Sequence, residues 1–76
     1  MDAYNFKQFE KDLENGFQIY LNFINNKYLI YKTNNNCYTQ ELVDWSPNKA
    51  QPKISIITHK RLYEIFLSAE NFEYKH

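Results

Sequence analysis

The sequence has few of the features that mark specialised protein classes. Its 76 residues include one cysteine, one glycine and two prolines, and nine basic residues balance nine acidic ones. A single cysteine excludes an internal disulfide, so a disulfide-stapled secreted scaffold is not expected. The balanced charge gives no whole-chain field that would attract nucleic acid or an anionic membrane. We expect one small domain over 1–76, because this length leaves no room for a second core.

Long hydrophobic runs are also missing. No apolar run approaches the roughly 20 residues that a membrane-spanning helix needs. The first residues carry neither a basic cluster nor an apolar stretch, so no signal peptide is expected. The sequence therefore predicts a cytoplasmic protein without a membrane-bound part.

The scarcity of glycine, cysteine and histidine also limits the catalytic chemistry. Phosphate-binding loops of the Walker or Rossmann type need several glycines, and this chain has only Gly16. No sequence pattern brings Cys37 and His59 together as nucleophile and base. Metal sites usually show Cys/His pairs at short spacing, which are lacking here. We expect no enzymatic activity, no cofactor and no metal site.

Aromatic residues and asparagine, in contrast, are abundant. Aromatic residues make up 18 % of the chain. A domain of this size buries only about 60 % of its unfolded surface, so many aromatic rings must fill the core while a few stay exposed. The frequent Asn, Lys, Tyr and Ile have AT-rich codons, which points to an AT-rich genome such as those of many low-GC bacteria and their phages.

Two segments show the period of an amphipathic helix. The first covers 5–15, with Asn5 as the predicted N-cap and Gly16 as the left-handed residue that ends it. The second follows Thr58, another predicted N-cap. The apolar faces consist of Phe6, Phe9 and Leu13 in the first helix, and of Leu62, Ile65, Phe66 and Ala69 in the second.

Between the helices the period changes to two, which predicts the strands of an antiparallel meander. Residues 16–24, with Phe17 as the first apolar position, and 27–33 flank Asn25-Asn26, a predicted two-residue turn. This turn places Tyr20 directly opposite Tyr31 on one face. The pairs that it implies on the core face are Phe23–Tyr28, Leu21–Ile30 and Ile19–Lys32.

The third strand, 37–43, is predicted without a unique register. A three-residue loop before it places Tyr38, Gln40 and Leu42 on the core face, whereas an even-length loop places Cys37, Thr39 and Val43 there. After a proline-containing loop over 46–53, residues 54–57 form either a fourth strand or the lead into the last helix. The tail over 71–76 is polar apart from Phe72 and Tyr74, and no further strand or helix is assigned to it.

The fold class that follows is α+β: a small two-layer domain with a three- or four-stranded antiparallel meander sheet, an N-terminal helix and a C-terminal helix. If both helices cover one face of the sheet, Tyr20, Leu29 and Tyr31 lie on the other. No Lys or Arg is predicted beside them, so this cluster favours a protein partner over stacked bases. Trp45, which ends the third strand, is the fourth candidate for this protein face, although a core position is more frequent for such a tryptophan.

We therefore expect a non-enzymatic protein–protein interaction module. The frequent use of residues with AT-rich codons suggests a phage or mobile-element accessory protein that binds and inhibits a host protein. A homodimer is the alternative for the same face, because a second copy of the chain would cover it equally well.

The segment 46–61 has the only local excess of charge. It contains Lys49, Lys53, Lys60 and Arg61 and no acid. Phosphate groups suit such a segment where it meets the free N–H groups of a helix start. The alternative function is therefore a small nucleic-acid-binding domain. The element order is similar to that of double-stranded-RNA-binding domains, but the loop between the first two strands is only Asn25-Asn26, and the similarity covers element order alone.

Overall fold

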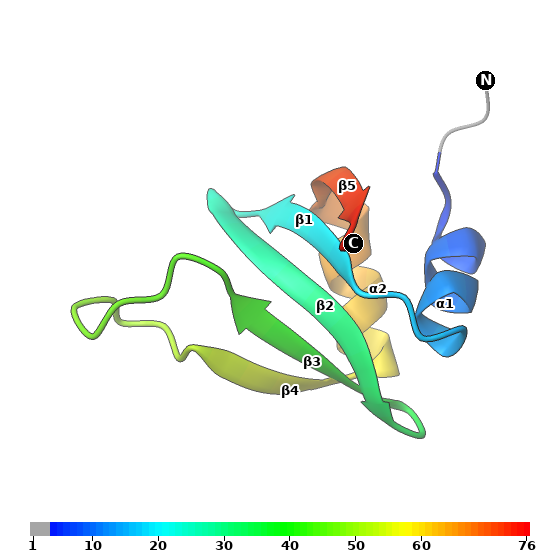
Figure 1. The fold of residues 1–76 in the computed structure, drawn as a ribbon, viewed down its shortest axis with the longest axis horizontal. Helices are drawn as coiled ribbons and strands as arrows, with labels where there is room; N and C mark the ends of the chain where they lie inside the picture. The colour runs from blue at the N-terminus through cyan, green and yellow to red at the C-terminus, as the bar shows by residue number, and fades with distance from the viewer. Residues whose placement is uncertain (1–3) are drawn as a thin grey trace.

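The computed structural model describes residues 4–76, which form two helices and one five-stranded antiparallel sheet (Figure 1). In chain order the elements are α1 (Phe6–Glu14), β1 (Ile19–Phe23), β2 (Asn26–Asn34), β3 (Cys37–Leu42), β4 (Ile54–Thr58), α2 (His59–Ser68) and β5 (Glu70–Tyr74). Across the sheet the strand order is β4-β3-β2-β1-β5. The predicted α+β class is confirmed.

The hydrophobic core lies between the sheet and the two helices, which cover the same face. Alternate strand positions supply its sheet side, as Ile19 and Leu21 do in β1. The buried cluster comprises Phe9, Leu13, Ile19, Leu21, Phe23, Tyr28, Ile30, Tyr38, Leu42, Ile57, Leu62 and Ile65. No helix within residues 4–76 packs on the opposite face, which we call the open face.

The predicted N-caps of both helices and the left-handed glycine after the first helix are confirmed. The Asn5 side chain accepts a hydrogen bond from the Gln8 amide at 2.8 Å, and the Thr58 hydroxyl accepts one from the Arg61 amide at 3.2 Å. Each cap satisfies a backbone N–H that has no partner within its helix. Gly16 follows α1 with φ +90°, in the left-handed region.

The first hairpin turns one residue earlier than predicted. Its turn residues are Ile24 and Asn25, with φ +47° and +63°. Tyr20 therefore lies opposite Leu29, and the predicted Tyr20–Tyr31 pair is wrong. The core-face pairs are Ile19–Ile30, Leu21–Tyr28 and Phe23–Asn26, in place of the predicted Phe23–Tyr28, Leu21–Ile30 and Ile19–Lys32. Each side chain still lies on its predicted face, because the register differs by two residues.

The observed register keeps a charge out of the core. In the predicted pairing Lys32 would face Ile19 beneath the helices. Instead, Lys32 lies beyond the end of β1, and its Nζ is 2.6 Å from Oε2 of Glu14 on α1. Burying an unpaired ammonium group is costly, so avoiding it offsets the unfavourable left-handed conformation of Ile24.

The structure decides between the alternatives for the third and fourth strands. Tyr38 and Leu42 belong to the core, as the three-residue loop predicts. The 54–57 segment is a strand rather than a lead into the helix, because β4 pairs with β3 along its whole length. β4 forms one edge of the sheet.

The tail, for which the sequence predicted no element, forms the fifth strand β5, which pairs with β1 at the other edge of the sheet. A bulge near Asn71, whose φ is +56°, interrupts the pairing. Phe72 packs against the core, while the ring of Tyr74 contacts Phe17 with a centroid distance of 5.1 Å. Phe17 itself precedes β1 and is exposed, so its predicted place in the first strand is wrong.

Candidate functional site

The open face carries three of the residues predicted to bind protein. Tyr20 and Leu29 pair directly across β1 and β2, and Tyr31 lies on the same face of β2. Both tyrosines are half-buried. Leu29 is only 5 % exposed. The cluster thus exists, but its leucine is not available for contact with a partner.

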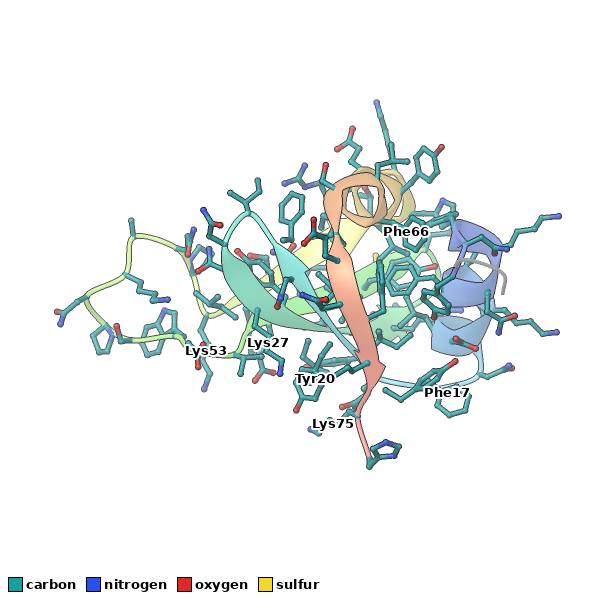
Figure 2. All side chains as sticks on the ribbon, turned by 90° about the horizontal axis from the view of Figure 1, so that it is seen from above. Phe17, Tyr20, Lys27, Lys53, Phe66 and Lys75 are labelled. Atoms are coloured by element: carbon teal, nitrogen blue, oxygen red, sulfur yellow. The ribbon has the colours of Figure 1, made fainter. Side chains whose placement is uncertain are left out.

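A cation lies beside this cluster. Nζ of Lys27 is 4.7 Å from the centroid of the Tyr20 ring, and Figure 2 shows the two residues next to each other. The prediction that no Lys or Arg lies near the cluster is wrong, because strand alternation puts Lys27 on the face of Leu29 and Tyr31. A cation–π contact of this kind holds one side of the ring.

The most exposed apolar side chains of the open face lie on β4. Ile54 is 49 % exposed and Ile56 is 62 % exposed. Their backbone partners on the neighbouring strand β3 are Glu41 and Thr39, respectively. Sequence reasoning missed both isoleucines because it left open whether 54–57 is a strand. The signal that could have found them is the alternation of Ile54, Ser55 and Ile56.

Strand β3 connects these isoleucines to the tyrosine cluster. Leu29 pairs with Glu41 and Tyr31 pairs with Thr39, so each row across the sheet ends at an isoleucine of β4. We call Tyr20, Leu29, Tyr31, Ile54 and Ile56 the open-face cluster. It crosses four strands and offers apolar contact area mainly at its β4 end.

Trp45 lies in the loop between β3 and β4, outside the buried core. Its side chain is exposed, and Nε1 donates a hydrogen bond to the Gln51 carbonyl oxygen at 3.2 Å. The core position that is more frequent for such a tryptophan is therefore not the observed one. Trp45 belongs to the loop that leads into the Ile54 end of β4.

The cations of the 46–61 segment fall into two groups. Lys49 and Lys53 precede β4, whereas Lys60 and Arg61 follow it in α2. The five extended residues of β4 separate the groups by about 16 Å. Nη1 of Arg61 lies 3.3 Å from Oε1 of Glu64. The four cations therefore do not converge on one phosphate-sized site.

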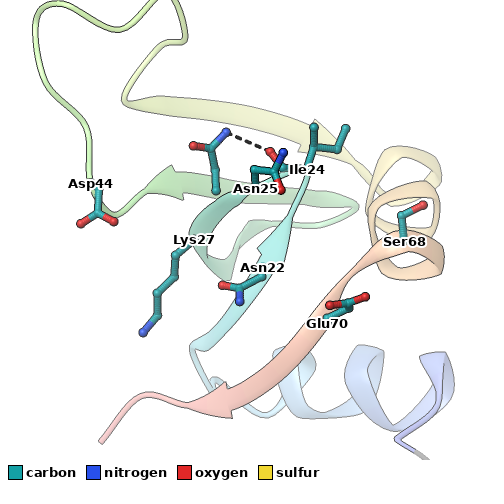
Figure 3. A pocket seen from close by; sticks show the side chains of 8 residues that line it. Asn22, Ile24, Asn25, Lys27, Asp44, Ser68 and Glu70 are labelled. Carbon is teal, nitrogen blue, oxygen red and sulfur yellow. Dashed lines mark hydrogen bonds between the residues drawn. The ribbon is translucent and has the colours of Figure 1, made fainter.

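A polar pocket of about 440 Å³ lies next to the β1–β2 turn (Figure 3). The Asn26 side-chain amide donates to the Ile24 carbonyl oxygen at 3.3 Å within it. The lining residues are Asn22, Ile24, Asn25, Asn26, Lys27, Asp44, Ser68 and Glu70. Small-molecule sites are mostly apolar with a few polar groups. This pocket is mostly polar and presents charges of both signs, so it lacks the apolar walls of such a site.

A second group of polar side chains surrounds Asp12, which is 4 % exposed. Its Oδ2 accepts hydrogen bonds from the hydroxyls of Tyr4 and Tyr74, each at 2.7 Å, and its Oδ1 accepts one from Nε2 of Gln8 at 2.8 Å. Burial by itself raises the pKa of Asp12, but these hydrogen bonds outweigh it and hold the pKa below its ordinary value. The carboxylate is thus fully engaged in hydrogen bonds, and its bond with Tyr74 connects β5 to α1.

Strand pairing brings Cys37 closer to His59 than the sequence suggests, because Cys37 pairs with Thr58. The Nε2 of the histidine, however, is hydrogen-bonded to Oε2 of Glu10 on α1. No hydrogen bond within residues 4–76 joins His59 to Cys37. The described part of the chain also contains no cluster of three or more His, Cys, Asp or Glu residues that could hold a metal ion.

Neither helix of the described chain is long and apolar enough to cross a membrane. Comparison of the chain with models of protein families, with curated proteins and with solved structures gave no match.

Proposed function

We propose that the chain is a non-enzymatic protein-interaction module that binds a partner protein through the open-face cluster. The observation that carries this proposal is the exposure of Ile54 and Ile56 on a sheet face that no described helix covers. Apolar side chains that are grouped and exposed are typical of protein-binding surfaces.

The abundance of residues with AT-rich codons supports a more specific form of the proposal. In this form the chain is a cytoplasmic accessory protein of a phage or mobile element, and its partner is a host protein that it inhibits. Nucleic-acid binding through Lys49, Lys53, Lys60 and Arg61 has less support, because β4 separates these cations and the net charge is zero.

The test is a pull-down with the tagged chain from the lysate of an AT-rich bacterium, with and without nuclease, followed by mass spectrometry. The informative variant is Ile54→Thr/Ile56→Thr, which keeps β-branched residues in β4 but removes apolar surface. The matched control is Leu67→Ser, which removes an exposed apolar side chain from α2. Tyr20→Ser/Tyr31→Ser tests the other end of the cluster.

We expect a stoichiometric protein that survives nuclease, is retained by Leu67→Ser and is lost with Ile54→Thr/Ile56→Thr. Circular dichroism must show that the variants remain folded. Capture that disappears with nuclease would instead support nucleic-acid binding. Capture that is unchanged in every sheet variant would refute the open-face cluster as the binding surface.

A further inference from the structure

We infer that the free edge of β4 binds an extended segment of a partner protein in which acidic residues flank a short apolar stretch. This inference rests on the function proposed above and specifies the chemistry of the partner. Addition of a strand to a sheet edge is a general mode of peptide recognition, in which main-chain hydrogen bonds provide affinity and side chains provide specificity.

One hydrogen bond shows which backbone groups of β4 are free. The Leu42 amide donates to the Lys53 carbonyl oxygen at 2.8 Å, which continues the pairing between β3 and β4. Hydrogen-bonded pairs alternate along an antiparallel ladder, so every second residue from Lys53 onward directs its backbone groups toward β3. The N–H and C=O groups of Ile54 and Ile56 therefore point to the outer edge, where no described strand pairs with them.

β4 lacks the devices that protect most edge strands. Natural edges carry charged residues, prolines or bulges that prevent further pairing. Residues 54–58 contain no charge and no proline, and their register with β3 is unbroken. An added strand would also lie beside the exposed side chains of Ile54 and Ile56, which supply apolar cross-strand contacts.

Cations lie at both ends of this edge. Lys53 directly precedes β4, and Lys60 lies in the first turn of α2 directly after it; both side chains are exposed. Within residues 4–76 neither forms an ion pair, whereas Arg61 shares its charge with Glu64. Glu41 lies on β3, two strand spacings or about 10 Å from an added strand. An incoming segment with acids at both ends therefore matches the charge of the edge.

The same cations disfavour pairing of β4 with the β4 strand of a second copy. A two-fold axis at Ile56, the middle residue of β4, would bring Lys53 of each copy against His59 of the other, directly next to Lys60. Like charges would then meet at both ends of the interface, which is destabilising. A strand with acidic ends would instead place a negative charge beside Lys53 and another beside Lys60, so that both contacts are attractive.

The test is a titration of the isotope-labelled chain with the synthetic peptide EEVTVTVEE, monitored by NMR and by amide hydrogen exchange. We expect slowed exchange at the outward-facing amides of Ile54, Ile56 and Thr58, with little change at Ser55 and Ile57. The matched peptide KKVTVTVKK should bind roughly tenfold more weakly, the effect of a few exposed ion pairs.

Three variants separate the backbone contribution from the charge contribution. Ile56→Pro removes an outward N–H and spares the pairing with β3, as prolines at sheet edges do, so it should abolish peptide binding. The control Ile56→Thr keeps that N–H and should retain most of the affinity. Lys53→Glu/Lys60→Glu should reverse the preference between the two peptides.

The outcomes distinguish this inference from the proposed function. Equal affinity for both peptides, or no protection at the three outward amides, would overturn the inference that the β4 edge binds a strand with acidic ends. If sedimentation equilibrium shows that the natural chain self-associates and that Ile56→Pro does not, a second copy occupies the edge, and the inference is likewise overturned. Partner capture that depends on Ile54 and Ile56 but tolerates Ile56→Pro would leave the proposed function standing without the edge. Partner capture that is unchanged by Ile54→Thr/Ile56→Thr, together with no protection of the outward amides by the peptide, would refute both.

Discussion

The hydroxyl of Tyr74 donates a hydrogen bond of 2.7 Å to Oδ2 of Asp12, a residue 62 positions earlier in the chain. The same oxygen accepts a second hydrogen bond, from the hydroxyl of Tyr4. One buried carboxylate thus holds together the segment before α1, the helix itself and the edge strand β5. The stability of this arrangement depends on the charge of Asp12, because hydrogen bonds to charged groups are stronger than those between neutral groups.

Asp12→Asn should lower the free energy of unfolding by about 1–3 kcal/mol, because the two tyrosine hydroxyls lose a charged acceptor. Urea denaturation followed by circular dichroism measures this loss. The control is Asp44→Asn, since Asp44 is exposed and should change stability by less than about 0.5 kcal/mol. Equal effects of the two substitutions would show that the Asp12 hydrogen bonds contribute nothing.

The stability of the chain should fall at acid pH through Asp12. Its pKa is lower in the folded state than the unfolded value of about 3.9, so its contribution is complete above that value. The contribution is lost as the pH falls through the folded-state pKa. Unfolding free energies measured between pH 6 and pH 2, roughly the range that brackets these values, should decrease less for Asp12→Asn than for the natural chain. Parallel curves would contradict the assignment.

Stability should also fall at alkaline pH through the tyrosines. Burial, followed by the hydrogen bond to Asp12, raises the pKa of Tyr4, and the hydrogen bond to Asp12 raises the pKa of Tyr74. Burial also raises the pKa of Tyr38. A raised pKa gives stability that is complete below the unfolded value of about 10 and is lost as the pH rises above it. Tyr74→Phe should flatten this decline, measured as the unfolding free energy between about pH 8 and pH 11. Parallel curves for the variant and the natural chain would contradict the contribution of Tyr74.

Ile24→Asn should stabilise the chain by about 1 kcal/mol, because Ile24 adopts a left-handed conformation that asparagine tolerates better. The side chain is 69 % exposed, so little buried area is lost. A thermal or urea unfolding curve measures the gain. Ile54→Asn provides the contrast, since it places asparagine in an extended strand and should destabilise. A loss of stability in Ile24→Asn would mean that the Ile24 side chain makes contacts worth more than the backbone strain.

Gly16→Ala should cost about 1–2 kcal/mol of unfolding free energy. The glycine has φ +90°, and no atom lies within 4 Å of the position that a Cβ would take. The cost is therefore conformational rather than steric. Gly16→Asn should lose less than Gly16→Ala, and the opposite order would contradict a left-handed helix end.

The sequence predicted the parts of the fold that local chemistry determines. Caps at Asn5 and Thr58, the left-handed Gly16 and the apolar faces of both helices depend on residues within a few positions of each other. The faces of β1 and β2 followed from alternation in the same way. These features do not depend on what the distant parts of the chain do.

The features that the sequence missed depend on contacts between distant segments. The hairpin register places Lys32 of β2 beside Glu14 of α1, and β5 pairs with the free edge of β1. Neither contact leaves a local pattern. For the candidate site, Tyr20 and Tyr31 followed from alternation, whereas Ile54 and Ile56 required knowledge that β4 joins the sheet.

The bulge at Asn71 has a consequence for polymerisation. The two sheet edges of one molecule differ, because β4 has cationic flanks and β5 carries Glu70 and Glu73. Repeated pairing of β4 in one copy with β5 in the next would be a head-to-tail contact, and such contacts build a fibre when their rotation does not close into a ring. The bulge interrupts the regular spacing of backbone groups along β5. We therefore expect the bulge at Asn71 to keep the protein from forming filaments.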